Sequence, residues 1–548
     1  MNEVTDIVIY GGTSAGIMAA IQASRMKHSV VLIEPSLRLG GLSTGGLGST
    51  DMGNNKSVGG LAREFYQQIK EYYDEPSNWQ GQTLGEYEVA MHEYFNCPWH
   101  DENLMWRFEP SAGLATFNKM LQEAGVRVIF GEHLDRNSGV KMSDGGITSI
   151  AMKSGRIFRG RMFIDATYEG DLMAAAGVSY HVGRESNGTY NETCNGVQYE
   201  RFKKGHQLNE GIDPYRIKGR PESGLLPGID PKECGADGDG DHRIQSYCFR
   251  MCLTDRLENR LPFLKPENYQ EIDFELLFRN YEIGGTDLPI PGLSDWGMSN
   301  ILPLNSGLLP NRKTDSNNKS GFSTDFIGQN YRYPEADDEE RVQIIRKHLD
   351  YQQGLMWTLS NHPRVPEHVR TEMSLWGVCK DEFIGSHGWP EQLYIREARR
   401  MVADYVLTEH NCLGHDAVND SIGLASYAMD SHHVRRFVHQ KGFVQNEGDV
   451  QVLKIAPYPI PYRSIVPRRA ECGNLLVPVC LSASHIAYGS VRMEPTFMLL
   501  GQSAATAACL ALDEQVPVQE VNYTQLKNRI VFDNQIVSWN EEMLEPGK

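Results

Sequence analysis

The stretch DIVIYGGTSAGIMAA, residues 6–20, decides the fold. Asp6 to Tyr10 is an apolar run rich in β-branched residues, and helix-forming residues follow the glycines, so the order predicted is strand, tight turn and helix. Gly11 and Gly16 take the outer places of a G-x-G-x-x-G loop, where the first glycine turns the chain and the last lets helix and strand pack closely. Thr13 stands in place of the middle glycine. The context predicts a dinucleotide loop whose helix N-terminus faces a pyrophosphate.

A second buried strand, residues 29–33, ends at Glu34, 23 residues after Gly11. An acid at this spacing is typical of a carboxylate that binds the ribose hydroxyls of a dinucleotide. The same carboxylate would repel a 2′-phosphate. NADP is therefore disfavoured, and FAD and NAD remain.

A second glycine-rich stretch, RLGGLSTGG at residues 38–46, follows this acid. By itself it fits an ordinary surface loop equally well. NAD enzymes rarely need such a loop, whereas FAD is longer and a second flexible loop can approach its flavin end. Joined to the first loop at this spacing, the stretch favours FAD.

The sequence resembles a family of FAD-dependent oxidoreductases whose N-terminus reads like VVIYGGTPAGIAAA, some of which carry the name xanthan lyase. A threonine after the glycine pair is usual in that family. The resemblance extends through most of the chain, in segments 106–110, 163–172, 183–185, 394–400, 426–433, 460–463, 474–478 and 482–505. At 477–482 this chain reads VPVCLS where the family more often has A-G-R-x-L-S, so the arginine of that motif is missing here.

The resemblance implies an α/β fold: a Rossmann-like three-layer FAD-binding domain with a large inserted α+β substrate domain. We expect a strand at 126–130 beside adenine, a hairpin of strands 147–153 and 156–158, a strand at 161–166 and a helix at 495–512. The predicted parts are residues 1–178 and 453–530 for the FAD-binding domain, 179–452 for the inserted substrate or cap domain, and 531–548 for a tail.

Cofactor-binding residues are expected in both glycine-rich loops, in the strand at 126–130, at the family's Asp-Ala-Thr that closes over the cofactor, and at the start of the C-terminal helix. A helix N-terminus directs partial positive charge, which would stabilise an anionic reduced flavin. The predicted set is Gly11, Gly12, Thr13, Ser14, Ala15, Gly16, Glu34, Pro35, Arg38, Gly40, Gly41, Leu42, Ser43, Thr44, Gly45, Val128, Ala166, Thr167, Glu494 and Thr496.

The candidate catalytic residues are Tyr427, Asp430, His432, His485 and Arg492. Histidine exchanges a proton near neutral pH, and oxidation of a carbon by flavin often needs a base for a hydroxyl or amine proton. Without the family match, adjacent histidines such as those at 432 and 433 are more often structural. Arg492 could contact the flavin or a substrate oxygen.

Two further patterns have ordinary explanations. Arg396, Arg399 and Arg400 have i, i+3, i+4 spacing, which predicts the solvated face of a helix, with an anionic-substrate clamp as the alternative. The run DGDGD at 237–241 lacks the glycine and the bidentate glutamate of a calcium loop. We expect no metal site.

The length of 548 residues predicts two or three structural modules, and the formal charge of −18 argues against nucleic acid or an anionic membrane as a partner. No run of 18 apolar residues occurs. Ten scattered cysteines favour reduced thiols and a cytoplasmic location, unless a signal peptide has been removed.

These features predict an FAD-dependent oxidoreductase, a dehydrogenase or an oxidase, that transfers a hydride between a small polar substrate and flavin N5. The substrate could be a carbohydrate derivative, with His432 or His485 as proton acceptor and oxygen or a redox partner as electron acceptor. No second dinucleotide fingerprint is visible, which disfavours NAD(P)H. The alternatives are a ligand-binding protein with structural or absent flavin, and a lyase with non-redox FAD.

Overall fold

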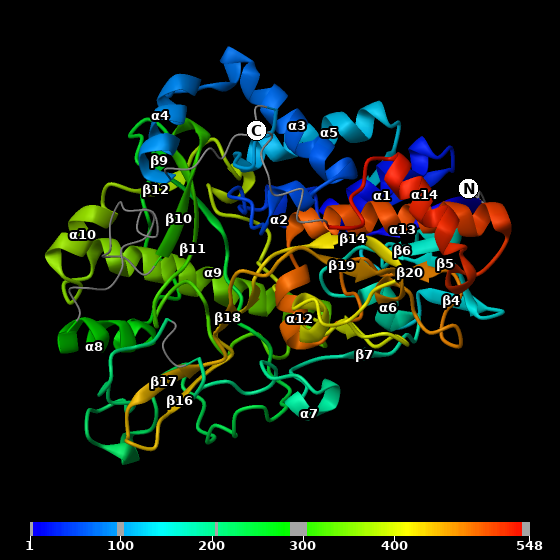
Figure 1. Ribbon diagram of the computed structural model, residues 1–548. Coiled ribbons are helices and arrows are strands. Elements are labelled where there is room, and N and C mark those ends of the chain that lie inside the picture. Colours follow the sequence, from blue (N-terminus) through cyan, green and yellow to red (C-terminus); the bar gives the residue numbers. More distant parts are fainter. Residues whose placement is uncertain (1–3, 96–102, 203–205, 285–303, 540–548) are drawn as a thin grey trace.

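The computed structural model describes residues 4–95, 103–202, 206–284 and 304–539 (Figure 1). Its N-terminus is the predicted unit: strand β1 (Val4–Tyr10), helix α1 (Ser14–Arg25) and strand β2 (Val30–Glu34). β1 pairs in parallel with β2 on one side and with β6 (Ile157–Asp165) on the other. The carboxyl end of β1 therefore lies at the centre of a parallel sheet.

The main sheet has the order β3-β2-β1-β6-β5-β4, with β20 (Leu475–Leu476) also paired to β6. β3 (Arg127–Phe130) confirms the strand predicted at 126–130; β4 is Val140–Ser143 and β5 is Gly146–Ala151. β6 pairs antiparallel with β5 through its first residues and parallel with β20 farther along. The strands predicted at 156–158 and 161–166 are thus parts of one strand, β6. Gly160 makes this possible, because a Cβ there would lie 2.7 Å from Val8 Cγ2.

The parallel part of this sheet, strands β3, β2, β1, β6 and β20, is the middle of three layers. Ile7, Ile9 and Leu32 on one face pack against α1, α3 (Gly60–Asp74), α5 (Pro110–Glu123) and α13 (Glu494–Glu514). Val8 and Ile33 on the opposite face pack with the β4–β5 hairpin and α6 (Asp171–Ala175). α1 and α13 lie side by side (Figure 1), and Gly501 permits this, since a Cβ there would meet Ala15 O at 2.1 Å.

α13 confirms the predicted C-terminal helix. Among the described helices it alone is long and apolar enough to cross a membrane, and 94% of its apolar window is buried inside the protein. Strand β14 (Ser421–Ala425) pairs with β19 (Tyr458–Pro461) and packs on α13. The chain therefore already contacts the nucleotide-binding layers before the predicted boundary at 453.

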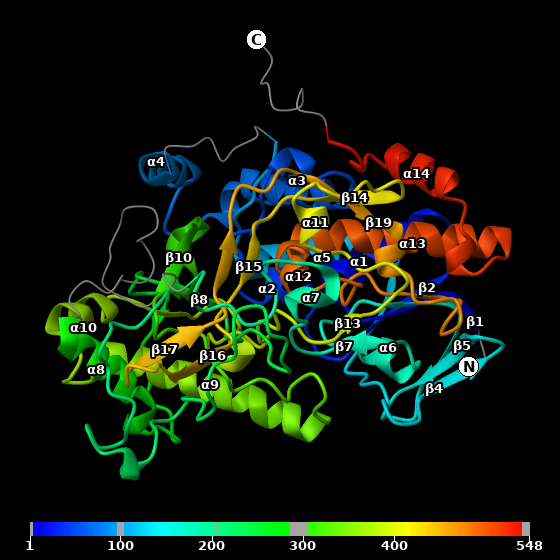
Figure 2. The ribbon, with the colours of Figure 1, turned by 60° about the horizontal axis from the view of Figure 1, so that its bottom comes forward.

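A second sheet forms the centre of the middle part of the chain. It is antiparallel, with the order β10-β11-β8-β12-β9, and its own core includes α8, α9 and α10 (Figure 2). The bounds are β8 (Met251–Thr254), β9 (Arg260–Leu261), α8 (Glu275–Gly284), β10 (Leu304–Leu309), β11 (Lys313–Asn318), α9 (Asp338–Asn361), α10 (Glu367–Met373) and β12 (Gly377–Cys379). The domain boundaries stay a prediction, and residues 540–548 of the predicted tail lie outside the described residues.

The helix expected around the three arginines is wrong. The segment is extended, and β13 (Arg400–Met401) pairs with β7 (Tyr180–His181). All three guanidinium groups are buried rather than solvated. Each has a carboxylate partner that is distant in sequence: Arg396 pairs with Asp325, Arg399 with Asp171, and Arg400 with Glu185. Sequence spacing cannot reveal such partners.

The remaining α-helices and strands of the described residues are short connectors, apart from α4 and α14 at the periphery. They are α2 (Gly41–Thr44), α4 (Leu84–Phe95), α6 (Asp171–Ala175), α7 (Asn187–Tyr190), α11 (Glu409–Cys412), α12 (His485–Val491), α14 (Tyr523–Phe532), β15 (Met429–Ser431), β16 (Arg435–Val438), β17 (Val444–Glu447) and β18 (Val450–Val452).

Candidate functional site

A cavity of about 260 Å³ opens at the carboxyl end of β1, beside the N-terminus of α1. Its walls come from both glycine-rich loops, from the segment after β6 and from α9. Seven of the residues predicted to bind cofactor line it: Gly11, Thr13, Glu34, Pro35, Arg38, Gly41 and Thr167. The crevice at the first strand-helix junction is therefore open.

The glycine loop is held tightly against the end of β6. Gly11 has φ +105°, and a Cβ there would lie 2.7 Å from the Ala166 carbonyl carbon and from Thr167 N. A Cβ on Gly16 would lie 1.9 Å from Gly11 O. Thr13 caps α1 by accepting from Gly16 N at 3.4 Å, and its hydroxyl donates to Ala166 O at 2.7 Å. The threonine therefore ties the loop to β6, a role that the usual glycine could not perform.

Glu34 lines the cavity from the end of β2. Its carboxylate accepts from Gly12 N at 2.6 Å and from Ser36 N at 2.7 Å. Burial raises the pKa of Glu34, and the backbone donors oppose this. Each carboxylate oxygen has a further lone pair, so Glu34 can hold the loop and still accept from a ribose hydroxyl.

The second loop meets the start of α13 through Tyr168, which the sequence analysis missed. Leu42 N donates to the Tyr168 hydroxyl at 2.9 Å, which donates to Glu494 Oε1 at 2.6 Å. Ser43 Oγ donates to Glu494 Oε2 at 3.0 Å. Burial raises the pKa of this carboxyl group. The start of α13 thus presents the buried Glu494 side chain in addition to its backbone dipole, and Thr496, two residues along, is also buried.

The cavity fits a bound dinucleotide at several points. Arg38, a wall residue, has a buried Nη2 atom with no hydrogen-bond partner in the described part of the chain. Gly40 and Gly41 have φ of +94° and +53°, which glycine adopts readily. Because neither has a Cβ, Gly40 can lie close to Phe117 and Gly41 close to Tyr168. Val128 does not line the cavity; His133 and Leu134 form its wall beyond β3.

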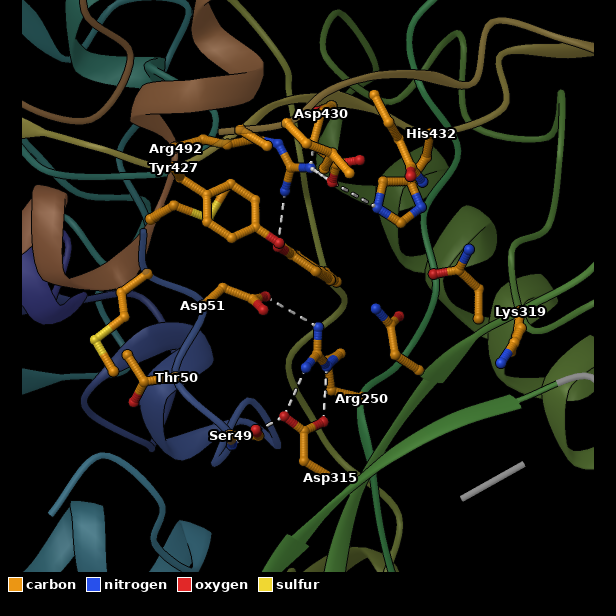
Figure 3. A pocket seen from close by; sticks show the side chains of 18 of the residues that line it. Ser49, Thr50, Asp51, Arg250, Asp315, Lys319, Tyr427, Asp430, His432 and Arg492 are labelled. Atoms are coloured by element: carbon orange, nitrogen blue, oxygen red, sulfur yellow. Dashed lines mark hydrogen bonds and ion pairs between the residues drawn. The ribbon is translucent and has the colours of Figure 1, made fainter. Parts of the chain in front are cut away.

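A larger cavity of about 430 Å³ (Figure 3) is lined in part by Met493, the N-cap residue of α13. Four of the five candidate catalytic residues line it: Tyr427, Asp430, His432 and Arg492. Leu393 lines the smaller cavity, and Tyr394, the next residue in the chain, lines the larger one. The two cavities therefore lie next to each other.

His432 is held between two carboxylates. Its Nδ1 lies 2.9 Å from Asp325 Oδ2, and its Nε2 lies 3.4 Å from Asp430 Oδ2. Burial and the charge of Arg396 lower the pKa of His432, but the two carboxylates outweigh them and raise it above its ordinary value. His432 and Arg492 lower the pKa of Asp430 to about 2, against the effect of burial.

Three guanidinium groups surround the Tyr394 ring, with Cζ of Arg396 at 4.6 Å, Arg492 at 5.6 Å and Arg250 at 5.7 Å from its centroid. Arg492 Nη1 donates to the Tyr394 hydroxyl at 2.7 Å. Each guanidinium also has an aspartate: Arg250 binds both oxygens of Asp315, and Arg492 Nη2 lies 3.2 Å from Asp430 Oδ2.

The sequence analysis missed Asp51, Arg250, Asp315 and Asp325 as residues of this site. Asp51 alone carried a local signal, because it lies five residues after the second glycine-rich stretch. The others come from the middle sheet and its loops, far away in the sequence.

His485 does not line the larger cavity. It is buried at the start of α12, where Nδ1 lies 2.8 Å from Glu397 Oε2 and Nε2 lies 3.1 Å from Ser431 Oγ. What separates the two histidines is their position, since His432 lines the larger cavity and His485 does not. Among the described residues, no group of three His, Cys, Asp or Glu side chains is arranged to hold a metal ion.

A family model described as FAD dependent oxidoreductase matches residues 6–530 of the chain, and no curated protein sequence matches. Among solved structures, L-proline dehydrogenase from P. horikoshii is 15% identical over 34% of this chain and 59% of that chain, with a TM-score of 0.24. L-amino acid deaminase from Proteus vulgaris is 13% identical over 34% and 53%, with a TM-score of 0.22. The chain spans less than two thirds of either protein.

Proposed function

Because the chain belongs to the family of FAD-dependent oxidoreductases, and its cofactor is accordingly FAD, we propose that it oxidises an alcohol carbon of a small polar substrate in the larger cavity. The observation that carries this proposal is His432, held between Asp325 and Asp430 on the wall of a cavity that reaches the N-cap of α13. When bound, FAD accepts a hydride at N5.

The residues that would hold FAD lie at the end of β2, at the N-terminus of α1, in the second glycine-rich loop and at the start of α13. Glu34 would accept from the ribose, and the N-terminus of α1 with Ser14 would bind the pyrophosphate. Gly41 would face the cofactor from the second loop, since it lines the same cavity. The partial positive charge of the α13 N-terminus would favour the reduced flavin.

His432 would take the proton of the substrate hydroxyl as the hydride leaves the same carbon. It must be neutral to do so, and its two carboxylate neighbours then stabilise the imidazolium that forms. Arg492 would act as a positioning residue, since its guanidinium binds both Asp430 and the Tyr394 hydroxyl on the same wall. Tyr427 would form part of the wall that holds the substrate.

The test is anaerobic reduction of the bound flavin by substrate, followed by loss of its yellow absorption. His432→Ala should keep its FAD and lose about 10²–10⁴-fold in the rate of bleaching. His433→Gln is the matched control, since the His433 ring contacts the His206 carbonyl and does not line the cavity. Equal bleaching rates in His432→Ala and wild type would remove His432 from the reaction. Product formation without bleaching would indicate a lyase.

A further inference from the structure

The charge that a ligand can reach beside Arg492 is negative, although arginines line the larger cavity. The side chain of Asp51 is 29% exposed and that of Asp430 is 17% exposed, against 6% for Arg250 and 2% for Arg492. The guanidinium groups of Arg250 and Arg492 are less exposed than these carboxylates, and each is paired with an aspartate. A substrate anion placed here would meet Asp51 and Asp430 before it met either arginine.

Figure 3 shows Asp51 near the middle of the cavity, on the same side as Tyr427, while Lys319 lies on the opposite side. Asp51 Oδ2 is 3.4 Å from Arg250 Nη1, its partner in an ion pair. Arg250 is committed to Asp315 by two shorter bonds of 2.7 and 2.6 Å. Asp51 therefore keeps acceptor capacity toward the cavity.

Hydrogen-bond donors and neutral amides complete the lining. The indole N–H of Trp106, a wall residue, is buried and has no partner among the described residues. Asn317, Asn318 and Gln451 also line the cavity. Carboxylates accept from hydroxyl groups, while the indole and amide N–H groups donate to them. A ligand rich in hydroxyl groups would satisfy both kinds of group at once.

We propose, on the basis of the alcohol oxidation above, that this cavity selects a neutral polyhydroxylated substrate, a sugar or sugar alcohol, and that Asp51 excludes the corresponding acid. An amine is disfavoured for a separate reason. Asp51 and Asp430 would stabilise its ammonium form, which has no lone pair on nitrogen and cannot transfer a hydride from the adjacent carbon. The hydroxyl groups of a sugar donate to Asp51 and carry no charge.

The experiment measures binding to the FAD-loaded protein by anaerobic equilibrium dialysis. The probes are D-glucose, D-galactose and D-mannose, each with its uronic acid and its 6-amino-6-deoxy sugar, so that only the group at C6 changes charge. We expect at least one neutral hexose to bind at least about tenfold more tightly than its uronate, because like charges repel at short range. In Asp51→Asn this ratio should fall about tenfold.

Asp51→Glu is the control, since it keeps the charge and should keep the discrimination, and FAD content reports whether each variant is folded. Uronates that bind as tightly as neutral hexoses, an unchanged ratio in Asp51→Asn, or no neutral hexose bound would each overturn the inference. Flavin bleaching separates the two proposals. A neutral sugar that binds without bleaching the flavin contradicts the proposed oxidation but agrees with the proposed selectivity. A uronate that bleaches the flavin agrees with the oxidation but contradicts the selectivity.

Discussion

Replacing Asp430 by asparagine tests whether His432 is the base. Asp430 Oδ2 lies 3.4 Å from His432 Nε2. At this distance and an effective dielectric constant of about 20, the attraction is about 5 kcal/mol, an upper bound of about 3.5 pH units. Carboxylates at such distances raise a neighbouring pKa by about 1–3 units. Since Asp430 is shared with Arg492, we expect the pKa of His432 to fall by about 1–2 units in Asp430→Asn.

The sign follows from the protonation state that the reaction requires. His432 accepts a proton only when neutral, so kcat/KM in the wild type should fall as the pH drops through a pKa above about 6.5. In Asp430→Asn the neutral form persists to lower pH, and this limb should move to lower pH by about 1–2 units. The plateau at high pH should also fall, because the imidazole is a weaker base.

The assay is the rate of anaerobic flavin reduction from pH 5 to pH 9, with substrate well below saturation so that the limb reports the free enzyme. Asp51→Asn is the matched control, because it removes the same charge from the same cavity but its ion pair is with Arg250. The limb should move less in this control than in Asp430→Asn. Equal shifts, or an unmoved limb in Asp430→Asn, would refute the assignment of His432.

Three further predictions concern the cofactor loop and the buried arginines. Gly16→Ala should yield protein without FAD, since the new Cβ would lie 1.9 Å from Gly11 O. The ratio of flavin to protein absorbance measures this. The control Gly85→Ala places its Cβ in open space and should keep its flavin absorbance. Glu34→Gln should weaken FAD binding about tenfold in a titration of the apoprotein, because a charged acceptor is replaced by a neutral one; unchanged affinity would place the ribose elsewhere. Arg400→Met should reduce the free energy of unfolding in urea by about 3–5 kcal/mol, because it leaves Glu185 and Glu397 without their cation, and a loss below about 1 kcal/mol would contradict this.

Some features of this protein are encoded locally. The strand, turn and helix of residues 4–25 follow from a β-branched run, two obligatory glycines and a helix-forming segment. Gly16 could be identified because its need for space comes from Gly11, five residues away, whereas the atoms that crowd Gly11 belong to Ala166 and Thr167. α13 followed likewise from a long apolar segment that begins at a proline. The structure confirms the strand, the first helix and the C-terminal helix in these segments.

Other features depend on residues that meet only after folding. The three arginines at 396–400 have the spacing of a helix face, yet their carboxylate partners Asp325, Asp171 and Glu185 overrode that pattern and buried them. His432 and His485 look alike in sequence. The fold turns the first toward a cavity and fastens the second between Glu397 and Ser431.

The sequence by itself therefore determined the nucleotide-binding layers, because hydrophobic periodicity, glycine and spacing act over a few residues. Only the tertiary structure decided which charges face the larger cavity. Its walls bring Asp51, Asp315, His432 and Arg492 together from segments up to about 440 residues apart. Charge and burial at a site depend on those distant neighbours, and no local pattern in the chain records them.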